Sequence, residues 1–137
     1  MRISECGFRN KKIFKIKIVM EKRELKERTK SFALKVIKAV EMLPKGKIGD
    51  ILGKQLLRAG ISVGANYRAA CRAKSTSDFM SKMGIVEEEA DETIYWMELL
   101  IEAGFVREDD LIPLLDEANQ ILAITIASIN TARKGKR

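Results

Sequence analysis

Histidine is absent from this sequence, and cysteine is nearly so. The 137 residues contain no His and two Cys, Cys6 and Cys71. Two cysteines are too few for a disulfide framework, and without His the usual zinc, haem and di-iron ligand sets cannot be assembled. We therefore expect neither a metal site nor a bound cofactor.

Proline and aromatic residues are also scarce. Pro44 and Pro113 are the only prolines, and aromatic residues make up 6% of the chain. Long spans hold Ala, Leu, Ile, Glu, Lys and Arg without the clusters of turn-forming residues that separate strands, which favours an all-α fold. The length fits one domain that can bury a core without cross-links.

Long hydrophobic runs are missing as well. The longest apolar or small stretch, Ile121 to Ile129, has nine residues, against roughly 20 for a membrane-spanning helix. Lys15 and Lys17 interrupt the apolar part of the N-terminal segment, and no small-residue cleavage site follows. We expect a cytoplasmic protein that does not cross a bilayer.

Apolar residues recur three or four positions apart in four segments, which predicts four helices. Asp50 is the expected N-cap of the second helix, Ser75 with Asp78 launches the third, and Pro113 is expected in the first turn of the fourth. The expected helices are about Glu21 to Leu43, Asp50 to Arg72, Asp78 to Ala103, and Asp109 to Ala132. Similar lengths and short connections predict an antiparallel up-down-up-down four-helix bundle.

The first 19 residues differ in texture from the rest. The stretch FKIKIV alternates like a strand, and residues 1–19 carry six Lys/Arg and one Glu. We interpret residues 1–19 as a basic extension, either disordered or preceding the native start. Residues 20–133 then form the bundle, and residues 134–137 a basic tail.

The second helix contains glycine at three interior positions. Each costs about 0.8 to 1 kcal/mol relative to Ala, so close packing or a ligand must offset Gly53, Gly60 and Gly64. Small residues on several faces of this helix favour close backbone packing over a ligand site. Asn66 lies on the predicted inward stripe, and we expect its amide to bond across helices and fix their register.

The stretch Ile121 to Ile129 is apolar or small around more of the helix than one core-facing stripe requires. Such a band on a soluble helix is typical of a protein interface. We therefore expect a homo-oligomer. The residues assigned to structural or oligomer contacts are Gly60, Gly64, Asn66, Ile124 and Ile126.

Charge is distributed unevenly along the chain. Residues 1–47 carry 15 Lys/Arg and 5 Asp/Glu, residues 48–74 carry 5 and 1, and residues 75–132 carry 2 and 13. The basic front half could track a phosphate backbone, or it could pair with the chain's own acids. The residues predicted to bind nucleic acid are Lys26, Lys30, Arg58, Arg68, Arg72 and Lys74.

No catalytic residues are expected. The acids of VEEEADE lie on one helix and have no His to complete a di-iron set, so a salt-bridging face is the better interpretation. Cys71 and Ser62 have no base among the candidates around them.

Two motifs resemble a known bacterial family. The stretch QLLRAGISVGANYRAACRAKS, with Gln55, Leu56, Arg58, Ala59, Ser62 and Asn66, is similar to four-helix-bundle proteins encoded in intervening sequences of 23S ribosomal RNA genes. The similarity spans Leu25 to about Ala132. It continues with Phe79, the run GIVEEEADET, Tyr95, Trp96, Glu98 and Leu99.

This resemblance implies an antiparallel bundle that assembles as a ring of five subunits, a homopentamer, without established catalytic residues. It also implies kinship with accessory proteins of diversity-generating retroelements, basic barrels that bind nucleic acid and a reverse transcriptase. A Glu that commonly follows the Asn by three residues is replaced here by Ala69, so no role of that Glu transfers.

Three hypotheses follow. The first is a non-enzymatic oligomeric scaffold or accessory protein that binds RNA or DNA through its first two helices. The second is an oligomeric protein–protein interaction module without nucleic-acid binding, or an accessory subunit of a reverse transcriptase. The third, which the sequence disfavours, is an enzyme that uses the acids of the third helix.

Overall fold

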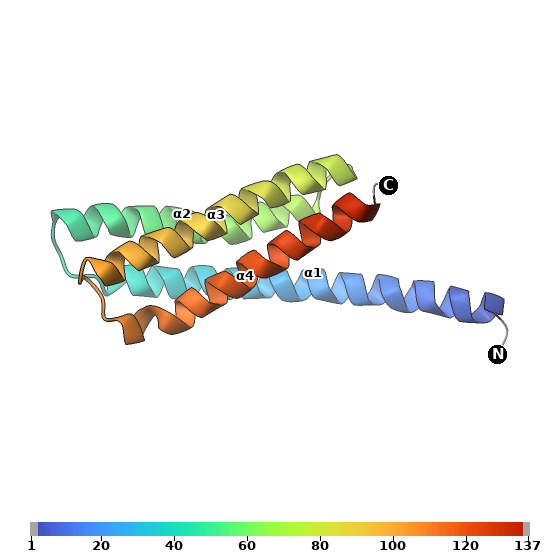
Figure 1. Cartoon of the computed structure of the whole chain (residues 1–137), viewed down its shortest axis with the longest axis horizontal. Helices are drawn as coiled ribbons and strands as arrows, with labels where there is room; N and C mark the ends of the chain where they lie inside the picture. The colour runs from blue at the N-terminus through green and yellow to red at the C-terminus, as the bar shows by residue number, and fades with distance from the viewer. Residues whose placement is uncertain (1–2, 136–137) are drawn as a thin grey trace.

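The computed structural model describes the backbone of residues 3–135 and the side chains at 12, 13, 15–17 and 19–135. The helices are α1 (Ile3–Glu41), α2 (Lys47–Cys71), α3 (Thr76–Glu102) and α4 (Glu108–Gly135). They pack against one another, and no strand occurs within the described residues (Figure 1). The expectation of an all-α fold with four packed helices is confirmed.

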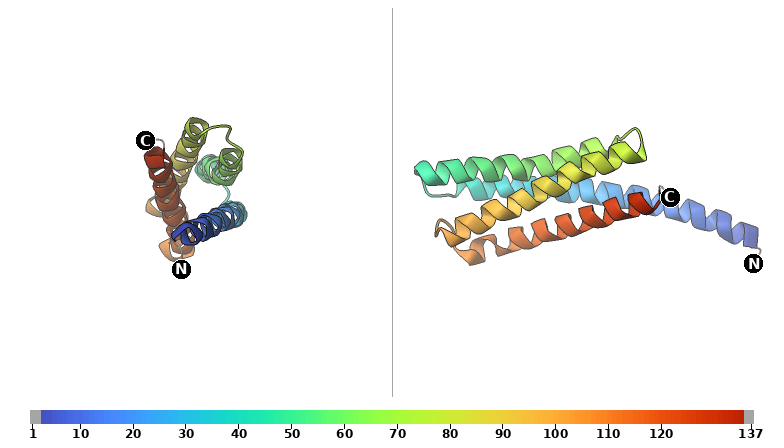
Figure 2. Two further views of the ribbon diagram at one scale, coloured as in Figure 1. Left: turned by 90° about the vertical axis from the view of Figure 1, so that its right-hand side faces the viewer. Right: turned by 45° about the horizontal axis from the view of Figure 1, so that its top comes forward.

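Helix α1 is much longer than the sequence predicted. It begins at Ile3, so the strand-like interpretation of FKIKIV is wrong. Its N-terminal part projects beyond the ends of the other three helices (Figures 1 and 2). Elongating an existing helix adds one hydrogen bond per residue fixed and needs no new nucleus, so six alternating residues do not stop it.

Two helix starts differ from the prediction and one cap is confirmed. Helix α2 begins at Lys47 after Gly46, whose φ is 150°, and Asp50 lies in its first turn rather than at the N-cap. At the start of α3, the Ser75 hydroxyl accepts a hydrogen bond of 3.0 Å from the backbone N–H of Asp78. Ser75 is therefore the N-cap, as predicted.

Pro113 lies in the second turn of α4, whereas the sequence predicted the first turn. Because α4 starts at Glu108, Pro113 is the sixth residue of the helix. Its ring cannot donate the N–H that would normally reach the carbonyl of Asp109. The earlier start places three acids, Glu108, Asp109 and Asp110, in the first turn. Their negative charges interact favourably with the positive end of the helix dipole.

The core follows the predicted apolar stripes. Leu25, Thr29, Phe32 and Val36 of α1 are all buried. The other helices contribute Leu56, Val63, Tyr67, Met83, Val86, Ala90, Met97, Leu100, Leu111, Leu114, Ala118, Ile121 and Ile129. Thr29, Thr93 and Thr125 are buried too, and each hydroxyl donates to a carbonyl of its own helix, so none is left unpaired.

Helices α1 and α2 approach closely at two glycines. A Cβ built on Gly60 would lie 2.8 Å from Val36 Cγ1, and one on Gly64 would lie 3.2 Å from Thr29 Oγ1. Side chains at these positions would push the helices apart, which confirms the close-packing explanation for the glycine-rich helix. Gly60 and Gly64 thus serve a contact within one chain.

The predicted interhelical bond of Asn66 is wrong. Its Nδ2 donates to the Ser62 carbonyl of the same helix at 2.8 Å, and the side chain is only half-buried. The next residue, Tyr67, enters the core instead. The bond back to the preceding turn satisfies the amide without a partner helix.

Helix α4 differs from the expectation in one further respect. It is long and apolar enough to cross a membrane by length and composition, a property that core helices of soluble bundles share. In this molecule it packs along α3, with Leu111, Ala118, Ile121 and Ile129 buried.

The single tryptophan lies on α3. Trp96 forms an edge-to-face pair with Tyr95, with ring centroids 5.2 Å apart. Its indole Nε1 is buried, and no acceptor lies within hydrogen-bond distance among the described residues.

Candidate nucleic-acid interface

The six residues predicted to bind nucleic acid do not form one patch. Arg58 lies on the α2–α3 side, where its guanidinium bonds Glu89 Oε2 at 3.3 Å and Glu92 Oε2 at 2.8 Å. The hydrogen bond to Glu92 is the main reason that the pKa of Arg58 is raised. These acids already neutralise Arg58, so the structure separates it from the other five.

Glu89 itself is in an unusual position for an acid. Partial burial raises the pKa of its carboxyl, and the nearby Arg58 opposes that effect. At the α2–α3 seam, Arg58 from the basic half of the chain is therefore paired with Glu89 and Glu92 from the acidic half.

Four of the predicted cations lie together on the outer side of the α1–α2 seam. Gly64 packs against Thr29, and the two helices run in opposite directions (Figure 1). Arg68, one turn after Gly64, therefore lies beside Lys26, which is about one turn before Thr29. Lys30 and Arg72 lie one turn away from Lys26 and Arg68 on the same faces.

These four side chains are available to a ligand. Lys26, Lys30, Arg68 and Arg72 are all exposed. Among the residues that the structure describes, the ion pairs involve other cations: Arg28, Arg58, Lys82 and Arg107. The acids of α3 thus engage Arg58 and leave this group uncompensated.

Lys74 occupies a different position, in the turn between α2 and α3. Its backbone N–H donates to Asp78 Oδ2 at 3.0 Å, and this bond is the main reason that the pKa of Asp78 is lowered. The side chain is exposed and borders the groove described below.

The sequence prediction missed part of the basic surface. Lys12, Lys15 and Arg23 share the helix face of Lys26 and Lys30 when 100° is allowed per residue. All five are exposed and lie on one continuous helix. We call these five residues, together with Arg68 and Arg72, the cationic stripe. Along α1 the stripe extends over about 27 Å, because Lys12 and Lys30 are 18 positions apart and each position adds about 1.5 Å.

A signal for this extension was present in the sequence. Cations three, four or eight residues apart fall on one face of a helix, but only if the helix continues upstream of Glu21. The strand-like interpretation of residues before Met20 concealed that spacing.

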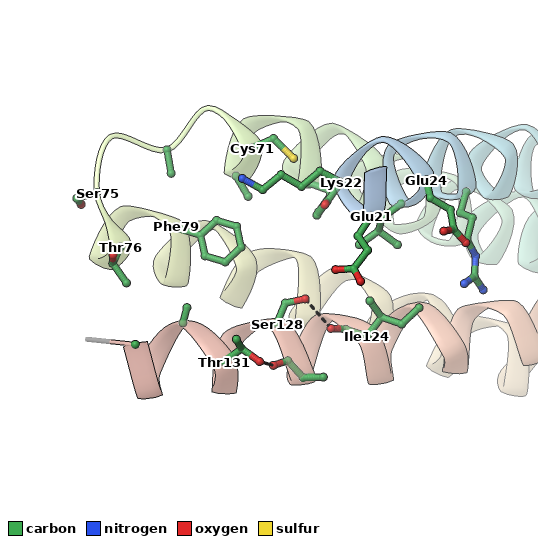
Figure 3. A pocket seen from close by; sticks show the side chains of 18 of the residues that line it. Glu21, Lys22, Glu24, Cys71, Ser75, Thr76, Phe79, Ile124, Ser128 and Thr131 are labelled. Atoms are coloured by element: carbon green, nitrogen blue, oxygen red, sulfur yellow. Dashed lines mark hydrogen bonds between the residues drawn. The ribbon is translucent and has the colours of Figure 1, made fainter. Parts of the chain in front are cut away.

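A second feature lies on another side of α1, where α1 and α4 separate near the C-terminal end of α4 (Figure 3). It is an open groove of about 920 Å³. Its wall on α1 carries Glu21, Glu24 and Leu25, its wall on α4 carries Ile124, Ala127, Ser128 and Thr131, and Tyr67, Ala70, Cys71 and Phe79 lie between. We call this feature the α1–α4 groove.

The groove is more suited to packing than to catalysis. Burial raises the pKa of the Tyr67 phenol, with a further contribution from the neighbouring Cys71 thiol, so neither a phenolate nor a ready base is provided at neutral pH. Among the described side chains, no group of three or more His, Cys, Asp or Glu is placed to hold a metal ion.

The two isoleucines expected at an oligomer interface lie on different faces. Ile124 is half-buried and lines the α1–α4 groove, whereas Ile126 is 38% exposed and lies outside the groove. Other exposed apolar residues flank the α1–α2 seam, namely Leu34, Ile37 and Ile61.

Comparison with known proteins places the chain in a family. Residues 21–127 match the family model described as 23S rRNA-intervening sequence protein. A crystal structure of a protein of unknown function from the S23 ribosomal protein family of Bacteroides thetaiotaomicron is similar, with 32% identity and a TM-score of 0.72. The match covers 77% of this chain and 97% of that one.

No curated protein matches this chain. The family match begins at residue 21, close to the point where α1 emerges from the bundle, so the projecting part of α1 lies outside the shared region. The family match covers most of the chain, and so does the match to the similar structure. The chain therefore belongs to the 23S rRNA-intervening sequence protein family.

Proposed function

We propose that this protein is a non-enzymatic, homo-oligomeric scaffold that binds RNA through the cationic stripe. In this proposal the up-down-up-down bundles assemble side by side into a ring of five subunits in the cytoplasm. The observation that carries RNA binding is the grouping of unpaired cations from two helices on one surface. The family name, which refers to sequences within ribosomal RNA genes, supports RNA as the first ligand to test.

The geometry of the stripe suits a phosphate backbone better than a base-reading site. Its cations lie in a row on the described part of α1, with two more beside them on α2. Aromatic side chains that could stack on bases are not among them. Binding should therefore depend on counterion release and show little sequence preference.

The test is a titration of labelled RNA at several salt concentrations. We expect the variant Lys26→Ala, Lys30→Ala, Arg68→Ala, Arg72→Ala to bind at least tenfold more weakly. Losing four phosphate contacts should also reduce the slope of log affinity against log salt by about 3.

A matched control removes four exposed cations elsewhere on α1, in the α1–α2 turn and at the start of α2: Lys35, Lys38, Lys45 and Lys47. It has the same net charge as the stripe variant. We expect it to retain affinity within about threefold, because salt screens charges that lie more than about 10 Å from the bound backbone. Equal loss in both variants would show that net charge, and not the stripe, drives binding.

A second candidate function is an oligomeric interaction module for proteins, including an accessory subunit of a reverse transcriptase. It is favoured by the exposed apolar residues Leu34, Ile37 and Ile61 beside the seam, since exposed apolar groups are typical of protein interfaces. Absence of salt-dependent RNA or DNA binding, together with stable assembly, would support this alternative.

A further inference from the structure

The cationic stripe is straight, because most of it lies on one unbroken helix. Its α1 members, Lys12, Lys15, Arg23, Lys26 and Lys30, fall within about 80° of one another around the helix when each residue turns it by 100°. The part of α1 that carries Lys12 and Lys15 projects beyond the bundle (Figures 1 and 2). The stripe is therefore a rigid row of charges, about 27 Å long, on the outer surface of a rod.

The stripe offers no ring on which a base could stack. The described aromatic side chains of α1 and α2 are Phe32 and Tyr67, and both are buried in the core. Tyr95 is exposed but lies on α3, away from these cations. Proteins that hold single strands without sequence preference combine a basic groove with aromatic side chains that stack on successive bases. At this stripe a single strand would gain the charge contacts alone.

Acids border the stripe and restrict the path of a bound strand. Glu27 lies one turn from both Arg23 and Lys30, on the side of the row away from α2, and its side chain is exposed. On the other side, beyond α2, Glu89 and Glu92 lie on α3. A flexible strand that left the row would meet these negative charges. A double helix is stiff, with a persistence length of about 150 base pairs for DNA, so it can contact the row along one line and continue into solvent.

We propose that the RNA bound by the cationic stripe is double-stranded, an inference that rests on the proposed function and specifies its ligand. The phosphates of a duplex already form a regular array. A row of cations on one helix can therefore contact several of them without ordering either partner. A single strand must be straightened along the row, and it has no stacking contact to offset that cost. Recognition of RNA duplexes by proteins depends mostly on shape and on phosphate and 2′-hydroxyl contacts.

Competition titrations of the full chain measure this preference. The probes are an RNA duplex of about 20 base pairs, longer than the roughly 16 that a double-stranded-RNA domain contacts, and an oligo-uridine strand with the same number of phosphates. We expect the duplex to bind at least tenfold more tightly at about 0.15 M salt. Its slope of log affinity against log salt should be about 1.3 times steeper, because each contact contributes about 0.9 on a duplex and about 0.7 on a single strand.

The outcomes separate this inference from the proposed function. The single strand could bind as tightly as the duplex or more tightly, while the variant without Lys26, Lys30, Arg68 and Arg72 loses affinity. That result would overturn the duplex preference and leave the stripe as the RNA site. Binding of neither probe, or equal loss in the stripe variant and its matched control, would overturn the proposed function and this inference with it.

A second measurement tests whether the row must be straight. Val19 lies between Lys15 and Arg23 and is 60% exposed. Val19→Pro kinks or breaks α1 at this point without a change in charge, whereas Val19→Ala keeps the helix intact. We expect Val19→Pro to weaken duplex binding at least threefold, as should the double variant Lys12→Ala, Lys15→Ala, and Val19→Ala to leave it unchanged. Urea unfolding checks that the bundle is intact in each variant. Unchanged duplex affinity in Val19→Pro or in the double variant would contradict the proposal.

Discussion

Helix α1 meets its two neighbours in different ways. Against α2 the helices close tightly, because Gly60 and Gly64 leave room for Val36 and Thr29. Against α4 they hold together through Arg28, which bonds Glu117 and Gln120, and then separate to leave the α1–α4 groove. The comparison shows that small residues in α2 set a fixed register on one side, while the other side stays accessible.

The closed seam has a functional consequence. The cationic stripe combines residues of α1 and α2, so its geometry depends on the register that the glycines allow. The open side has no such constraint.

The largest effect is expected from closing the space at the tight seam. In Gly60→Ala the new Cβ would lie within 3.1 Å of three atoms of Val36, a stiff β-branched side chain. Overpacking of this kind costs about 1 to 3 kcal/mol, which exceeds the gain of about 1 kcal/mol from replacing a helical glycine. Urea unfolding should show a lower midpoint.

Two variants sharpen this prediction. Gly84 of α3 has no atom within 4 Å of a built Cβ, so Gly84→Ala should raise the free energy of unfolding by up to about 1 kcal/mol. Val36→Ala removes atoms that the new Cβ at position 60 would meet. In a chain that already carries Val36→Ala, Gly60→Ala should therefore lower the free energy of unfolding by less than it does in the wild type. If Gly60→Ala and Gly84→Ala behave alike, the seam is not sterically closed.

A smaller effect is expected at the polar end of the open side. Arg28→Ala removes the hydrogen bonds to Glu117 and Gln120, and both of these side chains remain partly solvated. We expect a loss of about 0.5 to 1 kcal/mol, in the range of partly exposed ion pairs, measured by urea unfolding at low salt. Added salt should reduce the difference from wild type, and a salt-independent loss would point to packing by the Arg28 stem instead.

The groove itself should tolerate added volume. Ala127 is exposed and lines the α1–α4 groove, so Ala127→Leu should change the free energy of unfolding by less than about 0.5 kcal/mol at dilutions where chains are separate. A large destabilisation of the separate chain would mean that the groove is closed in solution.

The smallest effect concerns the third seam, between α2 and α3. Because burial raises the pKa of Glu89, the folded chain holds a proton at this site more readily than the unfolded chain. Its contribution to stability is therefore present at low pH and is lost as pH rises through the raised pKa, above the ordinary value of 4.5. Glu89→Gln should flatten the fall in unfolding midpoint between acid and neutral pH, and an unchanged pH profile would contradict this assignment.

The helical fold and the glycine contacts were predictable because both depend on local periodicity. Leu25, Thr29, Phe32 and Val36 recur three or four positions apart in the sequence, and they are buried. Gly60 and Gly64 were assigned to close packing because their intrinsic cost needed an offset. The extent of α1 was not predictable in the same way, since a short alternating stretch is compatible with a strand or with the continuation of a helix.

The candidate site depended on information that spacing does not contain. Which cations pair with acids is set by the register between helices, so Arg58 could not be told from Arg68 by sequence. Asn66 and Tyr67 are neighbours, and a small rotation of α2 decides which of them enters the core. The full cationic stripe required both the upstream helix and the α1–α2 register.

The lone indole of Trp96 provides an optical probe of this molecule. Its buried Nε1 has no acceptor among the described residues, and its ring rests against Tyr95 on α3, an element that contributes no residue to the cationic stripe. Its fluorescence should shift to longer wavelength when water reaches the ring. The emission spectrum of each variant above can therefore show whether that variant is folded.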